Sequence, residues 1–121
     1  MATCLIADDS KIIRMVLSKI MGNLGFETIE AEDGEEVIKQ WKTGNLDLII
    51  MDWRLQMMDG IDVLYMIRSN TKLKQPKIIF CSSLIDKAKI KEALQGGADD
   101  YIMKPFDEDI IESKITILGL L

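Results

Sequence analysis

The stretch LIADDSKI, residues 5–12, places an apolar run directly before two adjacent carboxylates, Asp8 and Asp9. The run is typical of a short buried strand, and the segment after it begins with Ser10, a residue type that often caps a helix. Adjacent acids repel each other, so their position has two explanations. Either they lie in a solvated loop beside a helix cap, or they form part of a site for a hard cation. The other strand ends of the chain decide between these explanations.

The rest of the chain repeats this order of a strand followed by a helix. Strands are predicted at residues 3–7, 26–31, 46–51, 77–81 and 101–103, and helices at residues 10–24, 35–41, 61–68, 86–95 and 107–118. Strands that are apolar along most of their length and alternate with helices are typical of a parallel sheet covered by helices on both faces. The expected fold is therefore a doubly wound α/β fold, with a single domain spanning residues 1–121.

Composition and charge narrow the possible functions. Of the 121 residues, 48% are hydrophobic and 29% are charged, as in an ordinary globular domain. The net charge of −5 argues against binding to nucleic acid, which needs a basic surface. The sequence has no apolar run as long as a membrane span and no signal-peptide pattern at its N-terminus. Cys4 and Cys81 lie in apolar runs and are expected to be buried free thiols of a cytoplasmic protein.

Polar residues follow four of the five predicted strands. Asp8 and Asp9 follow the first strand, Asp52 the third, Ser82 the fourth and Lys104 the fifth. In an open parallel sheet the ligand site lies at the carboxyl ends of the strands. Solvated loops would rarely produce this pattern by chance, so a functional site at this edge is the better interpretation.

The residue types at this edge indicate phosphoryl chemistry with a hard cation. Three neighbouring carboxylates need a cation or a proton to relieve their repulsion, and all-oxygen ligands favour Mg²⁺. Lys104 and Ser82 can contact phosphate oxygens through an ammonium and a hydroxyl group. The sequence contains no histidine, so the candidate nucleophile is a carboxylate. Asp52 is that candidate, because an aspartyl phosphate is a known type of covalent intermediate and Asp8 and Asp9 form the cation pair.

These motifs resemble the receiver domain of bacterial response regulators. The resemblance rests on ADDS at residues 7–10, on Asp52, on Ser82 and on KPF at residues 104–106, and it covers essentially the whole chain. It implies a flavodoxin-like sheet with the strand order 2-1-3-4-5 and five helices. It also implies that Asp52 accepts a phosphoryl group from a histidine kinase or a phosphotransfer protein.

The resemblance further implies a role for each residue of the edge. Asp9, Asp52 and the backbone carbonyl of Arg54 would bind Mg²⁺ directly, and Asp8 would hold it through water. Lys104 would contact the phosphoryl group, and Ser82 would move to bond to it.

Other implied features concern switching and the lifetime of the phosphoryl group. Tyr101 matches the switch aromatic of the family, which turns inward when the hydroxyl moves. Arg54 and Leu84 occupy positions that tune the lifetime of the phosphoryl group. The Lys104–Pro105 bond would be cis. Gln56 replaces the usual proline, which predicts a looser loop.

Several functions compete with a phosphorylated switch. A flavodoxin would share the fold, but Asp8 and Asp9 would repel the phosphate of its cofactor. A haloacid-dehalogenase-like phosphatase would carry an acid at position 54, where this chain has arginine. A phosphorelay intermediate, a phosphate sink and a pseudo-receiver that is not phosphorylated remain as alternatives to a chemotaxis-type regulator.

The expected activity is signalling rather than enzymatic turnover. The chain would catalyse only its own Mg²⁺-dependent phosphorylation and dephosphorylation. It ends soon after the last predicted helix, so its output is expected to be protein–protein binding, with the flagellar motor switch as one candidate target. It would be a monomer or a phosphorylation-dependent dimer.

Two surfaces are candidate partner sites. The first helix is expected to bury a face formed by Ile13, Val16, Leu17, Ile20 and Leu24. Met15 projects from the opposite side and is predicted to lie where the phosphodonor docks. The last helix has a second apolar stripe, with Ile110 and Ile117, that is not needed to cover the sheet and should bind a partner.

Overall fold

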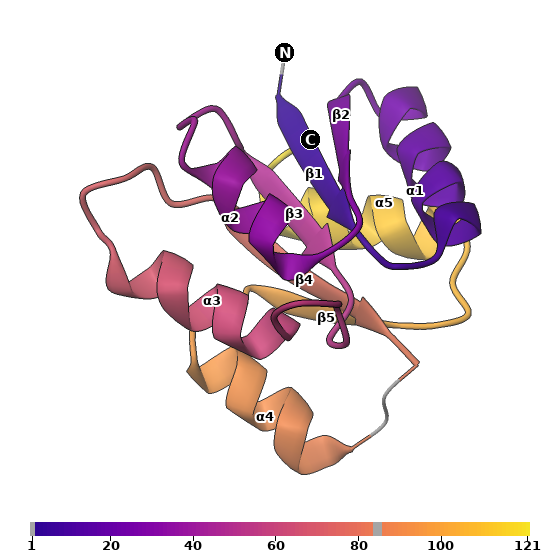
Figure 1. Cartoon of the computed structure of the whole chain (residues 1–121). Coiled ribbons are helices and arrows are strands. Elements are labelled where there is room, and N and C mark those ends of the chain that lie inside the picture. The colour runs from indigo at the N-terminus through magenta and orange to yellow at the C-terminus, as the bar shows by residue number, and fades with distance from the viewer. Residues whose placement is uncertain (1, 84–85) are drawn as a thin grey trace.

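The computed structural model describes residues 2–83 and 86–121, and within them five parallel strands form a single sheet (Figure 1). The strand order is β2-β1-β3-β4-β5. The strands are β1 (Thr3–Ala7), β2 (Glu27–Ala31), β3 (Leu48–Met51), β4 (Lys77–Ser82) and β5 (Asp100–Met103). The helices between and after them are α1 (Lys11–Asn23), α2 (Gly34–Trp41), α3 (Gly60–Ser69), α4 (Lys87–Gln95) and α5 (Glu108–Ile117). The predicted doubly wound fold and its strand order are confirmed.

Helices cover both faces of the sheet, with α1 and α5 on one face and α2, α3 and α4 on the other (Figure 1). Strand side chains alternate between the two faces, which divides the core into two clusters. In β1, Cys4 and Ile6 belong to the cluster beneath α1 and α5, whereas Leu5 and Ala7 belong to the other. Because both faces of the central strands are buried, they are apolar throughout rather than alternating.

Four of the five helices begin at residues whose side chains accept hydrogen bonds from the first turn, α3 being the exception. Ser10 Oγ accepts from the backbone N–H of Ile13 at 3.3 Å, so Ser10 is indeed the cap of α1. Asp107 caps α5 by accepting from Ile110 N at 2.8 Å. The cap explanation of residues 5–12 therefore applies to Ser10, and the cation explanation of Asp8 and Asp9 stays a prediction.

The buried face of α1 differs from the predicted one. Leu17 and Ile20 are buried as expected, but Val16 is 42% exposed, and Met21 is fully buried in its place. Met21 lies four positions after Leu17, so both point to the sheet, whereas Val16 lies about 100° around the helix from Leu17. The prediction for Val16 was wrong because the buried face of α1 is centred on Leu17, with Ile20 and Met21 within about 60° of it, and Val16 lies outside that arc.

The helices differ in how firmly they are packed. In α4, all of which the structure describes, Ala93 is the one buried residue, whereas α2 and α3 each bury four. Cys4 and Cys81 are buried free thiols, as predicted. None of the helices within residues 2–83 and 86–121 has the length and apolar character needed to cross a membrane.

An acidic edge with an internal lysine

The register of the sheet brings the predicted site residues together. Ala7 at the end of β1 pairs with Met51 at the end of β3. Asp8 and Asp52 directly follow these two residues and therefore lie side by side. Ser82, the last residue of β4, pairs with Met103, which directly precedes Lys104. The carboxyl ends of four strands therefore meet at one place, as the sequence predicted.

Three carboxylates form the acidic part of this edge. Oxygen atoms from Asp8, Asp9 and Asp52 all lie within 4.8 Å of one another. Asp8 is only 2% exposed, whereas Asp52 is half-buried and Asp9 is exposed. Hard oxygen ligands at this spacing fit Mg²⁺, particularly if one of them binds through water. The donor set is therefore suited to the predicted cation.

Lys104 lies between two of the acids. Its Nζ is 2.8 Å from Asp8 Oδ2 and 3.0 Å from Asp52 Oδ2. Burial raises the pKa of the Asp8 carboxyl, although hydrogen bonds from Lys104 and from the N–H of Ser10 act in the opposite direction. Burial disfavours the Lys104 ammonium, but its bonds to Asp8 and Asp52 outweigh this effect, and its pKa is raised. The lysine thus remains charged and holds the two carboxylates together.

The backbone around Asp8 is fixed from several directions. Its N–H donates to the carbonyl of Ala31 at 3.2 Å, and its Oδ1 accepts from Ser10 N at 2.9 Å. The carbonyl of Asp8 accepts a hydrogen bond of 2.7 Å from Nη1 of Arg14. Hydrophobic periodicity did not indicate Arg14, because a charged residue on the buried face of a helix contradicts the usual pattern. Its spacing of three from Leu17 was the available signal.

A hollow opens beside Asp52. It has a volume of about 320 Å³ and is lined by Asp52, Arg54, Ser82 and Ser83. The backbone N–H of Arg54 lies 3.4 Å from Asp52 Oδ1. The other residue predicted to tune the phosphoryl lifetime, Leu84, lies outside the described residues. The hollow therefore leaves space next to the Asp52 carboxylate.

The loop from Asp52 to α3 is closely packed at its end. A Cβ atom on Gly60 would lie 2.6 Å from the backbone oxygen of Asp52 and 2.7 Å from Phe80, so only glycine fits without movement. Gln56 O accepts hydrogen bonds from the N–H groups of Gly34 and Met58. The effect of Gln56 on the looseness of this loop stays a prediction.

An aromatic row connects the acidic edge to β5. Phe80 lies between Trp53 and Tyr101, with ring centroids 5.4 and 6.3 Å away. Tyr101 is buried, which raises the pKa of its hydroxyl, although a hydrogen bond with Ser82 acts in the opposite direction. The predicted switch pair, Ser82 and Tyr101, is therefore already in contact. The Lys104–Pro105 bond that follows is cis, as the resemblance implied.

The predicted partner surfaces lie on α1 and α5. Met15, Ile110 and Ile117 are all exposed, at 57%, 43% and 72%. Their exposure agrees with the prediction, whereas their binding roles remain predictions.

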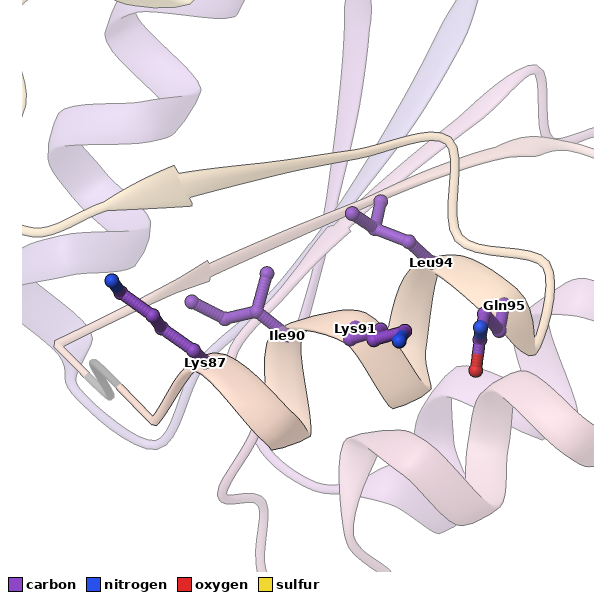
Figure 2. A pocket seen from close by; sticks show the side chains of 5 residues that line it. All are labelled: Lys87, Ile90, Lys91, Leu94 and Gln95. Carbon is purple, nitrogen blue, oxygen red and sulfur yellow. The ribbon is translucent and has the colours of Figure 1, made fainter.

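A second hollow, of about 460 Å³, lies on α4 and is lined by Lys87, Ile90, Lys91, Leu94 and Gln95 (Figure 2). It combines apolar side chains with two lysines on a chain that is acidic as a whole. It contains no part of the acidic edge.

A doubly wound sheet whose carboxyl edge combines an acid cluster, a hydroxyl and a lysine defines a receiver-type signalling domain. Residues 4–116 match the family model described as the response regulator receiver domain. The chemotaxis protein CheY of Pseudomonas aeruginosa is 33% identical over 112 residues, which cover 92% of this chain and 90% of that protein. The CheY of Bacillus subtilis is 38% identical over 106 residues, or 87% of each chain.

A solved structure shows the same likeness. The chemotaxis protein CheY4 of Vibrio cholerae superposes with a TM-score of 0.87 at 27% identity, covering 100% of this chain and 99% of that one. The chain belongs to the response regulator receiver domain family. It is therefore a signalling switch of a two-component system, and the predicted family and function class are confirmed.

Proposed function

We propose that Asp52 of this single receiver domain accepts a phosphoryl group from the phosphohistidine of a kinase or phosphotransfer protein. A carboxylate oxygen of Asp52 forms the new bond to phosphorus, while the bond from phosphorus to the donor nitrogen breaks and the electron pair leaves with the nitrogen. The contact of 3.0 Å between Lys104 Nζ and Asp52 Oδ2 carries this assignment, because it places a positive charge beside the attacking group. The hollow beside Asp52 leaves space for the phosphoryl group.

Mg²⁺ would be held by Asp9, Asp52 and the carbonyl oxygen of Arg54, and through water by Asp8. When bound, it neutralises charge on the phosphoryl oxygens during transfer. The protein groups position the donor phosphorus in line with the Asp52 oxygen. Lys104 and the Ser82 hydroxyl contact the transferred group. The same groups would support hydrolysis of the aspartyl phosphate, so the domain would change only its own state.

Phosphorylation would act through Ser82 and Tyr101. If Ser82 moves toward the phosphoryl group, its hydrogen bond with Tyr101 changes, and the ring, which is already buried, can repack against Phe80. That movement reshapes the surface formed by α4, β5 and α5, which includes Ile110 and Ile117. A target protein would bind this surface more tightly after phosphorylation, with a coupling free energy of roughly 1–3 kcal/mol.

A chemotaxis pathway is the best-supported setting, because the similar proteins from Pseudomonas, Bacillus and Vibrio are all chemotaxis proteins. The target would then be a component such as the flagellar motor switch, and the phosphodonor would dock beside Met15 on α1. The chain would work in the cytoplasm, a setting that suits the unpaired thiols of Cys4 and Cys81. It would act as a monomer or as a dimer formed on phosphorylation.

The phosphorylation site is tested with a small acyl-phosphate donor. The protein is incubated with acetyl phosphate and Mg²⁺, and its intact mass is measured. One phosphoryl group is expected on the wild type and on Asp59→Asn, an exposed acid at the start of α3 that makes no capping bond. None is expected on Asp52→Asn or after removal of Mg²⁺ with a chelator. Full incorporation into Asp52→Asn would reject the proposal.

A further inference from the structure

Arg14 is a buried arginine that lies outside the set of residues with a proposed part in phosphoryl transfer. It belongs to α1 and is only 7% exposed, although arginine is almost never buried unless it is paired. Its side chain extends to the end of β1, where Nη1 donates to the carbonyl oxygen of Asp8 at 2.7 Å. The contact is short and buried, as expected for a strong charge-assisted hydrogen bond.

The other side of the guanidinium is held by two glutamates. Nε donates to Glu30 Oε1 at 3.1 Å, and Nη2 lies 3.7 Å from Glu32 Oε1. These acids come from β2 and the residue after it, so the guanidinium joins three segments of the chain. Because the guanidinium is planar, pairing on one side fixes the direction of its donors on the other. The hydrogen bond to the half-exposed Glu30 and the longer ion pair with the exposed Glu32 therefore favour the orientation in which Arg14 points at the backbone of Asp8.

The Asp8 carbonyl belongs to the peptide group that also carries the N–H of Asp9. Fixing this carbonyl fixes the plane of the peptide before Asp9, and the bond from Ser10 N to Asp8 Oδ1 holds the peptide after it. With both flanking peptides held, the direction in which the Asp9 side chain leaves the backbone is restricted. Asp8 is also held through its N–H and its carboxylate. Asp9 is exposed, so its position depends mainly on these peptides.

We propose that Arg14 is a positioning residue of the cation site, which aligns Asp9 through the Asp8–Asp9 peptide. The inference rests on the proposed Mg²⁺ site at Asp8, Asp9 and Asp52. Groups that orient metal ligands typically change metal affinity about 10–100-fold when they are removed. Arg14→Met should therefore raise the Kd for Mg²⁺ at least about 10-fold.

The structure offers a matched control at the opposite end of the sheet. Arg68 donates from Nε to the carbonyl of Gly97 at 2.9 Å and from Nη2 to Asp99 at 3.1 Å. It makes the same two kinds of contact as Arg14, but far from the acidic edge. Arg68→Met should lower stability without changing the Kd for Mg²⁺ by more than about twofold. Any general effect of losing a paired arginine therefore appears in both variants.

The experiment is a calorimetric titration of each folded variant with MgCl₂, with urea unfolding recorded on the same samples. Arg14→Lys keeps the charge but lacks the planar fork, and its Kd is expected to rise about threefold or more. It also provides the decisive measurement if Arg14→Met does not fold.

The Kd values of the variants either support or contradict the positioning role of Arg14. A higher Kd for Mg²⁺ in both Arg14 variants, together with an unchanged Kd in Arg68→Met, supports the role of Arg14 in positioning Asp9. A wild-type Kd in Arg14→Lys, or an equal loss of affinity in Arg68→Met, overturns it. Failure of the wild type to bind Mg²⁺ would overturn the proposed function and this inference with it.

Discussion

Replacing Lys104 with methionine should destabilise the protein strongly, and in a manner that depends on pH and Mg²⁺. The substitution keeps the apolar stem and removes the ammonium that lies 2.8 Å from Asp8 and 3.0 Å from Asp52. With an effective dielectric constant of about 20, each contact corresponds to a gross attraction of roughly 5–6 kcal/mol. Desolvation of the three groups offsets much of this attraction. Breaking a buried pair by removing one partner typically costs about 3–5 kcal/mol, which is the expected loss here.

The chain provides a control with the same contact length. Lys114 Nζ lies 3.0 Å from Asp100 Oδ1, but the two side chains are 32% and 23% exposed, compared with 17% and 2% for Lys104 and Asp8. Solvent screens such a pair, so Lys114→Met should cost only about 0–1 kcal/mol. Urea unfolding at pH 7 in the absence of Mg²⁺ measures both losses.

The pH dependence of Lys104→Met follows from Asp8. Burial already raises the pKa of this carboxyl, and the substitution removes the strongest opposing hydrogen bond, so the pKa rises further. A carboxyl with a higher pKa in the folded state than in the unfolded state gains stability as pH falls, because the folded state binds the proton more tightly. The difference in unfolding free energy between Lys104→Met and the wild type should therefore become smaller as pH falls from neutral to about pH 4, which is near the pKa of the carboxyl in the unfolded state.

Mg²⁺ should narrow the gap between Lys104→Met and the wild type as well, because it supplies the missing positive charge. Adding Asp8→Asn to Lys104→Met should recover part of the lost stability. A loss no larger than that of Lys114→Met, or a gap that does not change with pH, would refute the electrostatic reasoning.

Three further perturbations test the core, a surface ion pair and the output surface. Phe80→Ala removes a fully buried ring between Trp53 and Tyr101, and should lower the free energy of unfolding in urea by about 3–5 kcal/mol. A loss of stability below about 1 kcal/mol would mean that the aromatic row is not tightly packed. Hydrogen bonds from Lys74 and from the N–H of Thr3 hold the pKa of Asp47 below its usual value. The ionised carboxylate therefore stabilises the fold above about pH 4, and this stabilisation is lost as pH falls through the folded pKa. Asp47→Asn should thus cost about 1 kcal/mol at pH 7 and nothing near pH 2, and a cost independent of pH would contradict the assignment. Ile117→Lys should leave stability within about 0.5 kcal/mol, since the side chain is 72% exposed, but should weaken binding of the phosphorylated protein to its target about tenfold; unchanged binding would place the output elsewhere.

The order of elements could be predicted because each strand and helix has a clear local signal. The run at residues 48–51 is apolar throughout since β3 is central and both of its faces are buried. Asp8, Asp52, Ser82 and Lys104 could be grouped because the topology of parallel sheets places strand ends together. These predictions needed only hydrophobic periodicity and the rule that ligand sites lie at the carboxyl ends of parallel strands.

Other features depended on three-dimensional detail that periodicity does not contain. Burial of Arg14 depends on Glu30 of β2 and on Glu32 just after that strand, which become its neighbours only when the sheet forms. The exposure of Val16 depends on a rotation of α1 that its apolar residues left undetermined. The contacts of Lys104 with two acids depend on its side-chain conformation, which periodicity does not contain. The three carboxylates had already indicated that a positive charge lies among them.

The single buried residue of α4 has a consequence for exchange with solvent. Backbone amide hydrogens exchange through local opening, and the free energy of such opening is low where few side chains are buried. Within α4 only Ala93 is buried, and the hydroxyl of Tyr65 on α3 bonds to Glu92 in an exposed position. The amides of α4 should therefore exchange faster than those of α2 and α3. A helix that opens easily can also be displaced with little free energy, because α4 contributes only Ala93 and the partly buried Ile90 to the core cluster on its side of the sheet.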